Sequence, residues 1–468
     1  MSQARELANK QIVVLGLARQ GIALARYLAE QGAQVTVSDV KTAEQLAEAI
    51  KSLDGFAIKY VLGGHPVELL EGCDLLCLSG GVPVNLPIVV EAQTRGIELA
   101  NDAQIFIERC PAPVIGITGS AGKTTTTALT GEILKTAGFK AWVGGNIGNP
   151  LVADLASIAS DDKVVMELSS FQLEVMTTSP HIAAVLNITP NHLDRHPSME
   201  DYIAAKKRIL DFQDYRDVAV LGYDDAAARQ LAGDVRGYVR FFSQQALVGR
   251  GAFVREGNLV LRRDEEQVVC AVSDLKLRGS HNVWNVLAAC ALAGEAGATV
   301  EAMAQVAASF TGVAHRLQLV RKLRGVRYYD DSIATTPERL IAALRSFDEP
   351  IVLVCGGRDK HLPWEEAAQW IVERVSHVVL FGEMAGLVKS QLSSVKHVHC
   401  AQAQASQMSN TRCVVHEADT LEKAVKIAAQ AAQAGDVVLL SPGGTSFDAF
   451  KDFAERGDRF TEIVNGLE

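Results

Sequence analysis

The sequence predicts an α/β protein with three domains. Apolar segments of strand length alternate with helix-length amphipathic segments along much of the chain, which is typical of parallel sheets covered by helices. The 468 residues exceed one ordinary core, and at about 150 residues per domain they suggest about three domains. A proline-rich connector over residues 111–113 separates the first α/β pattern from the second. We therefore expect domains over residues 1–108, 109–313 and 314–468.

Composition and charge disfavour several classes of protein. Hydrophobic residues make up 48% and charged residues 21% of the chain, which indicates a globular protein. The formal net charge of −10 leaves no basic excess for nucleic acid, and no apolar segment approaches the ~18 residues of a membrane span. The eight cysteines are scattered, as expected for thiols in a reducing compartment, and the first residues show no signal peptide. We expect a cytoplasmic protein with no nucleic-acid partner and no membrane insertion.

The first domain is predicted to open with a βαβ unit. Strands are expected over residues 11–16 and 34–39, with a helix over 22–31 between them. The loop over residues 16–21 lacks the middle glycine of G-x-G-x-x-G, because Ala18 stands there. Asp39 ends the second strand, where such folds hold a ribose or base, and a further strand over 74–79 runs into a glycine turn. The pattern favours a nucleotide or nucleotide-sugar site over a purely structural unit.

A phosphate-binding loop opens the predicted central domain. Residues 114–125 read VIGITGSAGKTT, an apolar strand that breaks into glycines before a helix expected over 124–136. Backbone N–H groups of such a loop cradle phosphates, the lysine pairs with the outer phosphates, and the next hydroxyl ligates Mg2+. Ile117 stands where the strict motif has its first glycine, and an ordinary glycine-rich turn is the alternative. The residues expected at the triphosphate are Gly119, Ser120, Ala121, Gly122, Lys123, Thr124 and Thr125.

Three later positions suit the same site. Glu167 lies near the end of a strand expected over 163–168, and an acid at such a strand tip suits Mg2+ or a water molecule. His192 lies in a polar loop after a strand expected over 182–188, which favours a site over a structural histidine. Lys206 belongs to a helical pattern, where a solvated lysine is the usual interpretation.

A long apolar helix is expected to begin near Gly279. Its first turn carries Asn282 and Asn285, whose three-residue spacing places them on one side of the helix. Side-chain amides suit the donors and acceptors of a purine base, with helix capping as the alternative. Arg316, at the expected end of the second domain, could reach a phosphate.

The third domain is predicted to contain another parallel sheet. Strands expected over residues 326–330, 351–355, 377–381, 412–416 and 437–441 alternate with helix-length segments. The loops over residues 331–335, 356–360 and 441–447 follow three of these strands. Ligands gather at the carboxyl ends of parallel strands, so these loops are expected to line a site.

The motifs over residues 118–125, 187–195, 279–285, 315–316 and 331–332 together resemble the Mur ligase family, ATP-dependent amide-forming enzymes of peptidoglycan synthesis. The match spans almost the whole chain in the right order. The loops over 16–21 and 441–457 look most like those of members that add D-glutamate to UDP-N-acetylmuramoyl-L-alanine. The resemblance implies a Rossmann-like N-terminal domain for the UDP substrate, a central ATPase domain of P-loop type and a Rossmann-like C-terminal domain for the amino acid. We expect a monomer.

The resemblance also implies roles for individual residues. Lys123, Glu167, His192 and Lys206 would be catalytic. Thr124 and Glu167 would hold one Mg2+, and His192 and a carbamylated Lys206 would serve a second, because a carbamate supplies the oxygens that an ammonium lacks. ATP would also contact Asn282, Arg316 and Asp331. The UDP substrate would contact Arg19, Gln20, Asp39, Ser79, Gly80 and Asn146, and glutamate would contact Thr335, Lys360, Ser446 and Phe453.

One position departs from the family pattern. The usual loop reads D-S-K-A-T-N, whereas residues 331–336 read DSIATT, so Ile333 replaces a lysine. A positive charge near the incoming amino acid or nucleotide is lost, which leaves D- versus L-glutamate open. A sister ligase for another amino acid, or folylpolyglutamate synthetase, is the nearest alternative. A nicotinamide-dependent dehydrogenase is an alternative from another class, but it leaves the phosphate loop unexplained. A P-loop motor is a third alternative, and it would turn over ATP without a small-molecule acceptor.

Overall fold

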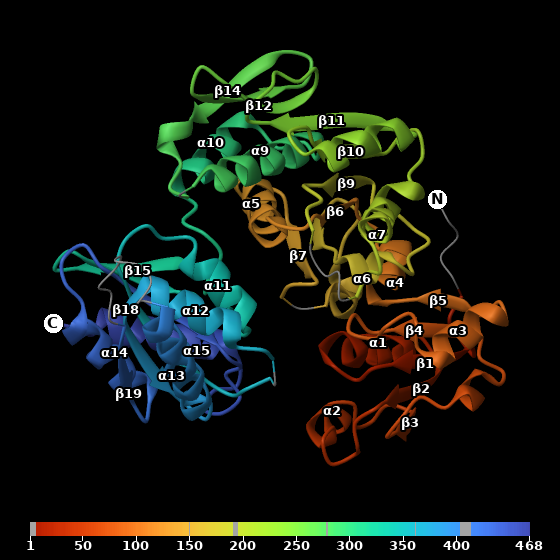
Figure 1. Ribbon diagram of the computed structural model, residues 1–468. Coiled ribbons are helices and arrows are strands. Elements are labelled where there is room, and N and C mark those ends of the chain that lie inside the picture. The colour runs from red at the N-terminus through yellow and green to blue at the C-terminus, as the bar shows by residue number, and fades with distance from the viewer. Residues whose placement is uncertain (1–5, 149, 191–194, 278, 361, 403–412) are drawn as a thin grey trace. The chain divides into compact units, whose positions relative to one another are not determined.

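The computed structural model describes residues 6–148, 150–190, 195–277, 279–360, 362–402 and 413–468. Within these residues the chain forms three β-sheets flanked by helices (Figure 1), which confirms the predicted α/β class. Two compact units divide the chain, Met1–Phe310 and Thr311–Glu468, called the N-terminal and C-terminal units below. The first two sheets lie in the N-terminal unit and the third lies in the C-terminal unit.

The first sheet is parallel, with strand order β3-β2-β1-β4-β5. Because β1 pairs with β2 on one side and β4 on the other, the chain reverses its direction across the sheet at β1, and ligands bind beyond the carboxyl ends of strands at such a point. The expected strand over 34–39 is confirmed as β2, whereas the first helix begins earlier than expected. The elements are β1 (Gln11–Leu15), α1 (Arg19–Glu30), β2 (Gln34–Asp39), α2 (Ala47–Lys51), β3 (Ile58–Leu62), η1 (Val67–Leu70), β4 (Leu75–Leu78), α3 (Pro87–Thr94), β5 (Glu98–Ala100) and α4 (Asp102–Arg109).

The central sheet has strand order β14-β13-β12-β11-β10-β9-β6-β8-β7 and is parallel from β7 to β12. Strands β13 and β14 add an antiparallel edge. Its strands are β6 (Val114–Thr118), β7 (Ala141–Gly145), β8 (Lys163–Glu167), β9 (Ile182–Val185), β10 (Val218–Gly222), β11 (Tyr238–Ser243), β12 (Gly251–Arg255), β13 (Asn258–Arg262) and β14 (Glu266–Ala271). The accompanying helices are α5 (Lys123–Thr136), η2 (Leu151–Ser157), α6 (Ser170–Leu173), α7 (Met199–Asp211), α8 (Ala226–Gln230), η3 (Leu231–Asp234), η4 (Val272–Asp274), α9 (Ser280–Glu295) and α10 (Val300–Ser309).

Two features of this sheet differ from the sequence prediction. Strands β10 to β14 were not predicted. The mixed segment Glu266–Ala271 carries a weak apolar signal, whereas Val218–Gly222 (VAVLG) is an apolar strand that the sequence prediction missed. The strand expected over 182–188 ends at Val185, because Asn187 turns to bond the phosphate loop. Helices α5 and α9 pack side by side and bury a shared apolar core that includes Leu129 and Leu287 (Figure 1).

The third sheet has strand order β15-β16-β20-β17-β18-β19, with only β15 antiparallel among the described pairs. Apolar clusters cover both of its faces. The predicted strands are present with small shifts at their ends, and Arg412, where one was expected to start, lies outside the described residues. The elements are β15 (Gln318–Leu323), β16 (Val326–Asp330), α11 (Pro337–Leu344), β17 (Ile351–Gly356), α12 (Glu365–Arg374), β18 (Val375–Phe381), α13 (Ala385–Gln402), β19 (Val414–Glu417), α14 (Leu421–Ala431), β20 (Val437–Gly443) and α15 (Phe453–Asn465).

No helix in the described part of the chain combines the length and the apolar character needed to cross a bilayer.

Candidate functional site

The predicted phosphate loop connects β6 to α5. Gly122 caps the helix with a φ of +85°, a conformation that favours glycine, and a Cβ there would lie 2.3 Å from Oδ1 of Asn285. The first N–H groups of α5 have no partner within the helix, and they carry the positive end of its dipole. The loop and helix therefore present donors where a phosphate would sit.

Asn187 fixes the shape of this loop. The N–H of Ser120 donates to the carbonyl oxygen of Asn187 at 2.9 Å, and the N–H of Ala121 donates to its Oδ1 at 2.8 Å. The side-chain amide of Asn187 donates back to the carbonyl of Ala121 at 3.0 Å. Two N–H groups that the sequence assigned to the phosphates, those of Ser120 and Ala121, are thus used inside the protein.

Alanine at Gly122 is expected to weaken ATP binding by at least about tenfold, because it combines backbone strain with a collision against Asn285. Gly138 provides a matched control at the other end of α5. Its φ is +92°, and a Cβ there would meet nothing within 4 Å. Nucleotide titration of Gly122→Ala and Gly138→Ala by calorimetry measures the difference, and equal affinities would contradict this account of the loop.

Two lysines converge on the carbonyl oxygen of Gly119. Nζ of Lys123 and Nζ of Lys206 each donate to this oxygen at 2.9 Å. Lys206 is 1% exposed, so its interpretation as a solvated lysine is wrong. Burial and the charge of Lys123 hold the pKa of Lys206 well below that of an ordinary lysine, against the opposing effect of Glu167. The lowered pKa favours a neutral, nucleophilic amine at Lys206.

Glu167 joins the phosphate loop to the next strands. Its carboxylate is 2% exposed and accepts one hydrogen bond from the Thr124 hydroxyl and one from the Asn146 amide, each at 2.9 Å. Nη2 of Arg19 donates to the carbonyl of Asn146 at 3.3 Å. The structure thus brings together residues predicted for the metal and for the UDP substrate. Among the described residues no group of three or more His, Cys, Asp or Glu side chains gathers, and His192 lies outside them.

A buried histidine that the sequence did not single out ties these elements together. Nε2 of His196 lies 2.9 Å from Oγ of Ser170, and Nδ1 lies 3.1 Å from Oε1 of Glu174. The ring also packs on Tyr202, with centroids 5.1 Å apart. The Tyr202 hydroxyl lies 3.1 Å from Oγ of Ser120, and its ring lies under Nζ of Lys206. His196 is fully buried, so this Ser–His–Glu arrangement supports the loop and α7 and leaves no room for a substrate.

The predicted UDP-substrate residues gather at the carboxyl ends of β1, β2 and β4. Asp39 is 8% exposed, and its oxygens accept the N–H groups of Leu17 at 2.7 Å and Lys41 at 2.9 Å. Oε1 of Gln20 accepts the N–H of Gly80 at 3.1 Å, next to the buried Ser79. These bonds order the loops at the carboxyl edge of the first sheet, where the chain reverses its direction across the sheet. The roles of the residues toward a nucleotide stay predictions.

The two asparagines at the start of α9 bond to each other. Nδ2 of Asn285 donates to Oδ1 of Asn282 at 3.0 Å, and the hydroxyl of Thr126 lies 3.4 Å from Oδ1 of Asn285. The cap residue is Gly279 and has no side-chain cap, so the capping alternative is wrong. The pair links α5 to the first turns of α9.

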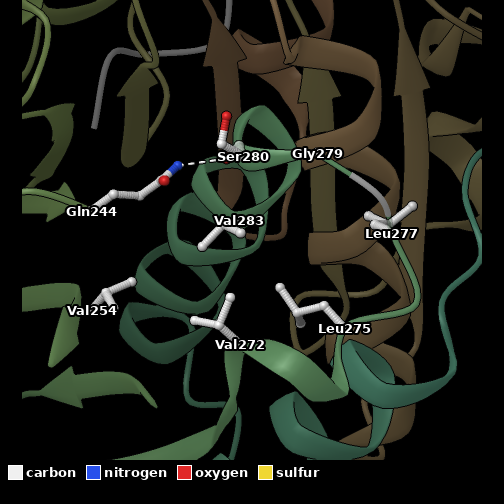
Figure 2. Close-up of a pocket in the computed structure, with 8 residues that line it drawn as sticks. All are labelled: Gln244, Val254, Val272, Leu275, Leu277, Gly279, Ser280 and Val283. Atoms are coloured by element: carbon white, nitrogen blue, oxygen red, sulfur yellow. Dashed lines mark hydrogen bonds between the residues drawn. The ribbon is translucent and has the colours of Figure 1, made fainter. Parts of the chain in front are cut away.

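A hollow of about 410 Å³ lies beside the same end of α9 (Figure 2). Figure 2 shows aliphatic side chains around it and the amide of Gln244, which donates to the carbonyl of Ser280 at 2.6 Å. Its volume is in the range of small-molecule pockets. Its lining consists of Gln244, Val254, Val272, Leu275, Leu277, Gly279, Ser280 and Val283.

In the C-terminal unit, Asp331 lies buried at the end of β16. Its carboxylate accepts the Ser441 hydroxyl at 2.9 Å and the N–H of Leu317 at 3.2 Å. Burial raises the pKa of Asp331 to about 7, although the Ser441 bond and the charge of Arg316 oppose the shift. Asp331 and Arg316, both predicted to contact the nucleotide, therefore lie near each other.

Arg456, which is fully buried, holds together the two loops predicted to bind glutamate. Its guanidinium donates to Oγ and to the carbonyl oxygen of Ser332 at 2.9 Å, and to the carbonyl oxygen of Gly444 at 3.2 Å. The Ser332 hydroxyl in turn donates to the carbonyl of Phe453 at 2.7 Å. The sequence predicted no role for Arg456, and the structure shows that it joins these two loops.

The remaining glutamate-site residues lie on the same loops. Nζ of Lys360 donates to the Thr335 hydroxyl at 3.2 Å, and Ser446 is 2% exposed in the loop after β20. The loops after β17 and β20 are joined by an isolated bridge between Arg358 and Thr445. The structure therefore gathers Thr335, Lys360, Ser446 and Phe453 at one edge of the third sheet.

Comparison with known families gives matches along the chain. The Mur ligase MurD-like N-terminal domain matches residues 10–101, the Mur ligase middle domain matches residues 117–293, and the Mur ligase glutamate ligase domain matches residues 315–444. The UDP-N-acetylmuramoylalanine–D-glutamate ligase of Acetivibrio thermocellus is 41% identical over 465 residues, 99% of this chain and 98% of the relative. The enzyme of the same name from Symbiobacterium thermophilum is 41% identical over 462 residues, 98% of each chain.

Solved structures share the fold at lower identity. UDP-N-acetylmuramate-alanine ligase MurC of Thermotoga maritima has a TM-score of 0.55 at 19% identity, covering 98% of this chain and all of that chain. MurF of Acinetobacter baumannii has a TM-score of 0.56 at 17% identity, covering 96% of this chain and 93% of that chain. These likenesses establish the fold alone.

Proposed function

Because the chain belongs to the Mur ligase family, we propose that it joins D-glutamate to UDP-N-acetylmuramoyl-L-alanine while converting ATP to ADP and phosphate. The observation that carries this proposal is the cluster on the phosphate loop, where Lys123 and Lys206 share one carbonyl and Thr124 bonds Glu167. We further propose the domain limits 1–108, 109–313 and 314–468 for the UDP substrate, ATP and glutamate, respectively.

The chemistry to be accomplished is activation of a carboxylate. A carboxylate does not condense with an amine in water, because it lacks a leaving group and its carbonyl carbon is electron-rich. An oxygen of the alanyl carboxylate attacks the γ-phosphorus of ATP, the bond to ADP breaks, and an acyl phosphate forms. The glutamate amine then attacks the carbonyl carbon, phosphate leaves, and the amine loses a proton.

The residues of the loop support this route through charge and position. Lys123 would exchange the carbonyls of Gly119 and Ser120, which it now bonds at 2.9 and 3.3 Å, for phosphate oxygens. The N–H groups at the start of α5 would hold the phosphates in place. Asn282, beside the hollow at α9, would bond the base, and Arg316 and Asp331 would contact the nucleotide.

The residues present fit Mg2+ at one position. The Thr124 hydroxyl and the Glu167 carboxylate are oxygen donors of the kind that Mg2+ takes, and they lie 2.9 Å apart. The Lys206 amine does not fit a cation until a carbamate replaces it, after which it would serve a second Mg2+ together with His192. When bound, Mg2+ supplies positive charge that offsets the charge on the transferring phosphoryl oxygens.

The two outer sites would deliver the reaction partners. The carboxyl edge of the first sheet carries Arg19, Gln20, Asp39, Ser79 and Gly80. The guanidinium of Arg19 bonds the carbonyl oxygen of Asn146, which directly follows β7 of the central sheet. We propose that this edge holds the UDP substrate. Thr335, Lys360, Ser446 and Phe453 would hold glutamate.

The proposal is tested by supplying UDP-N-acetylmuramoyl-L-alanine, ATP and Mg2+ with D-glutamate or L-glutamate and weighing the product by mass spectrometry. We expect the adduct with D-glutamate only, with ADP released in equal amount. Product from L-glutamate, or from another amino acid in a panel, would identify a sister ligase. ADP release without any adduct would overturn the proposed ligation.

A further inference from the structure

Two cations flank the short loop segment that follows β16. Nη1 of Arg339 donates to the carbonyl of Ile333 at 3.2 Å, and Nζ of Lys360 donates to the hydroxyl of Thr335 at 3.2 Å. Both residues are exposed overall, although the amine at the end of the Lys360 side chain is partly removed from solvent. Within the described residues neither cation forms an ion pair with a carboxylate. The segment from Ile333 to Thr335 is therefore bordered by positive charge on two sides.

Neighbouring arginines already form ion pairs or hydrogen bonds within the protein. Arg358, in the loop that carries Lys360, pairs with Glu383 through two bonds of 2.8 and 2.9 Å. Arg345, just after α11, lies 3.7 Å from Glu366. Arg456 is fully buried against Ser332 and Gly444. Arg339 and Lys360 differ from these residues because they are exposed and form no ion pair with a carboxylate in the described part of the chain.

The two charges affect each other. The pKa of Lys360 is lowered, first by burial of the amine and then by the positive charges of Arg339 and Arg456. Like charges held close together raise the free energy of the site, and an anion between them relieves that cost. A ligand with two carboxylates satisfies both cations at once.

The start of α11 fixes where the guanidinium lies. Thr336 caps the helix, Pro337 occupies its first turn, and the N–H of Arg339 donates to the Thr336 hydroxyl at 3.4 Å. From this turn the side chain reaches back to Ile333, the position where the usual family loop has a lysine. Arg339 on the helix therefore supplies a positive charge to the loop in place of the lysine that Ile333 replaces.

We propose that Arg339 binds one carboxylate of the incoming glutamate, with Lys360 near the other, and so determines the preference for a dicarboxylic amino acid. The inference rests on the proposed function. A guanidinium binds a carboxylate in a two-bond geometry that a lysine cannot reproduce, so Arg339 adds orientation as well as charge.

Arg339→Leu is expected to raise the KM for D-glutamate by at least about tenfold, the loss expected for one charged hydrogen-bonded contact. The KM values for ATP and for the UDP substrate are expected to stay unchanged. Arg345→Leu is the matched control, because it removes an arginine near the other end of the same helix, and it should leave all three values unchanged. Arg339→Gln serves as a second variant should the leucine variant fail to fold.

A reciprocal variant sharpens the test. Ile333→Lys in the Arg339→Leu background is expected to recover part of the affinity for D-glutamate, because it restores a cation to the same segment without the two-bond geometry of the guanidinium. An unchanged KM for D-glutamate in both Arg339 variants would overturn the inference. A rise in the KM for ATP alone would assign Arg339 to a phosphate and overturn it as well. If the wild-type protein forms no adduct, the proposed function itself fails, which is a distinguishable result.

Discussion

Replacing Lys123 by alanine is expected to lower the rate of ADP formation by about a hundredfold to a thousandfold. Lys123 begins α5 and is held by the carbonyls of Gly119 and Ser120, so its ammonium already lies over the loop that the phosphates would occupy. Negative charge moves between phosphate oxygens during transfer, and a positioned cation stabilises it. Steady-state release of ADP, measured with both substrates saturating, gives the effect.

Lys135 provides the matched control for Lys123. It lies in the last turn of the same helix and forms an exposed ion pair with Glu132 at 2.8 Å. Exposed pairs of this kind contribute at most about 1 kcal/mol, so Lys135→Ala should keep the wild-type rate. Full activity in Lys123→Ala would contradict the assignment of the loop to ATP.

Local patterns predicted the parts of the fold that depend on neighbouring residues. The strands 34–39 (QVTVSD) and 326–330 (VRYYD) are short segments rich in β-branched or aromatic residues, and both form with the predicted ends. The helix after the phosphate loop begins one residue earlier than expected, because Gly122 in its left-handed conformation leads directly into Lys123. The residues of the adjoining loops and helix caps decide where such elements begin and end.

Contacts between distant residues could not be predicted this way. Lys206 reaches Gly119 across 87 positions of the chain, so its burial follows from how α7 packs and leaves no trace in the helical pattern around it. Asn187 stands 66 positions from Ala121, and its Oδ1 accepts the Ala121 N–H, so that this N–H is no longer available to a ligand. His196 and Arg456 were missed for the same reason. A buried polar side chain is recognised by its partners, and those partners lie far away in sequence.

The departure at Ile333 illustrates the other limit of sequence comparison. A motif read position by position shows a lost lysine. The structure places Arg339, six positions later, against the carbonyl of that same residue. One turn of α11 thus supplies a cation from outside the motif, and an assignment of charge to a site has to count side chains that enter from neighbouring elements.

Replacing Lys206 by alanine is expected to lower activity by about a hundredfold or more, through loss of the carbamate that we propose this lysine forms with CO2. A neutral amine attacks the carbon of CO2, a C–N bond forms, and one proton is released. The lowered pKa of Lys206 keeps its amine neutral at a lower pH than an ordinary lysine would allow, because burial and Lys123 disfavour its charged form. The wild-type protein is therefore expected to lose activity when CO2 is removed and to regain it when bicarbonate is added.

Lys207 is the matched control for this mechanism, since it stands next in the chain and has the opposite electrostatic environment. Its ammonium pairs with Asp211 at 2.9 Å, and that bond raises its pKa, so it stays protonated and does not react with CO2. Lys207→Ala should keep both the wild-type rate and its response to bicarbonate, whereas Lys206→Ala should show neither. Lys206→Arg tests the remaining explanation, because it keeps a positive charge and cannot form the carbamate. Wild-type activity in that variant would show that the site needs a cation at this position, and the carbamate mechanism would then be wrong.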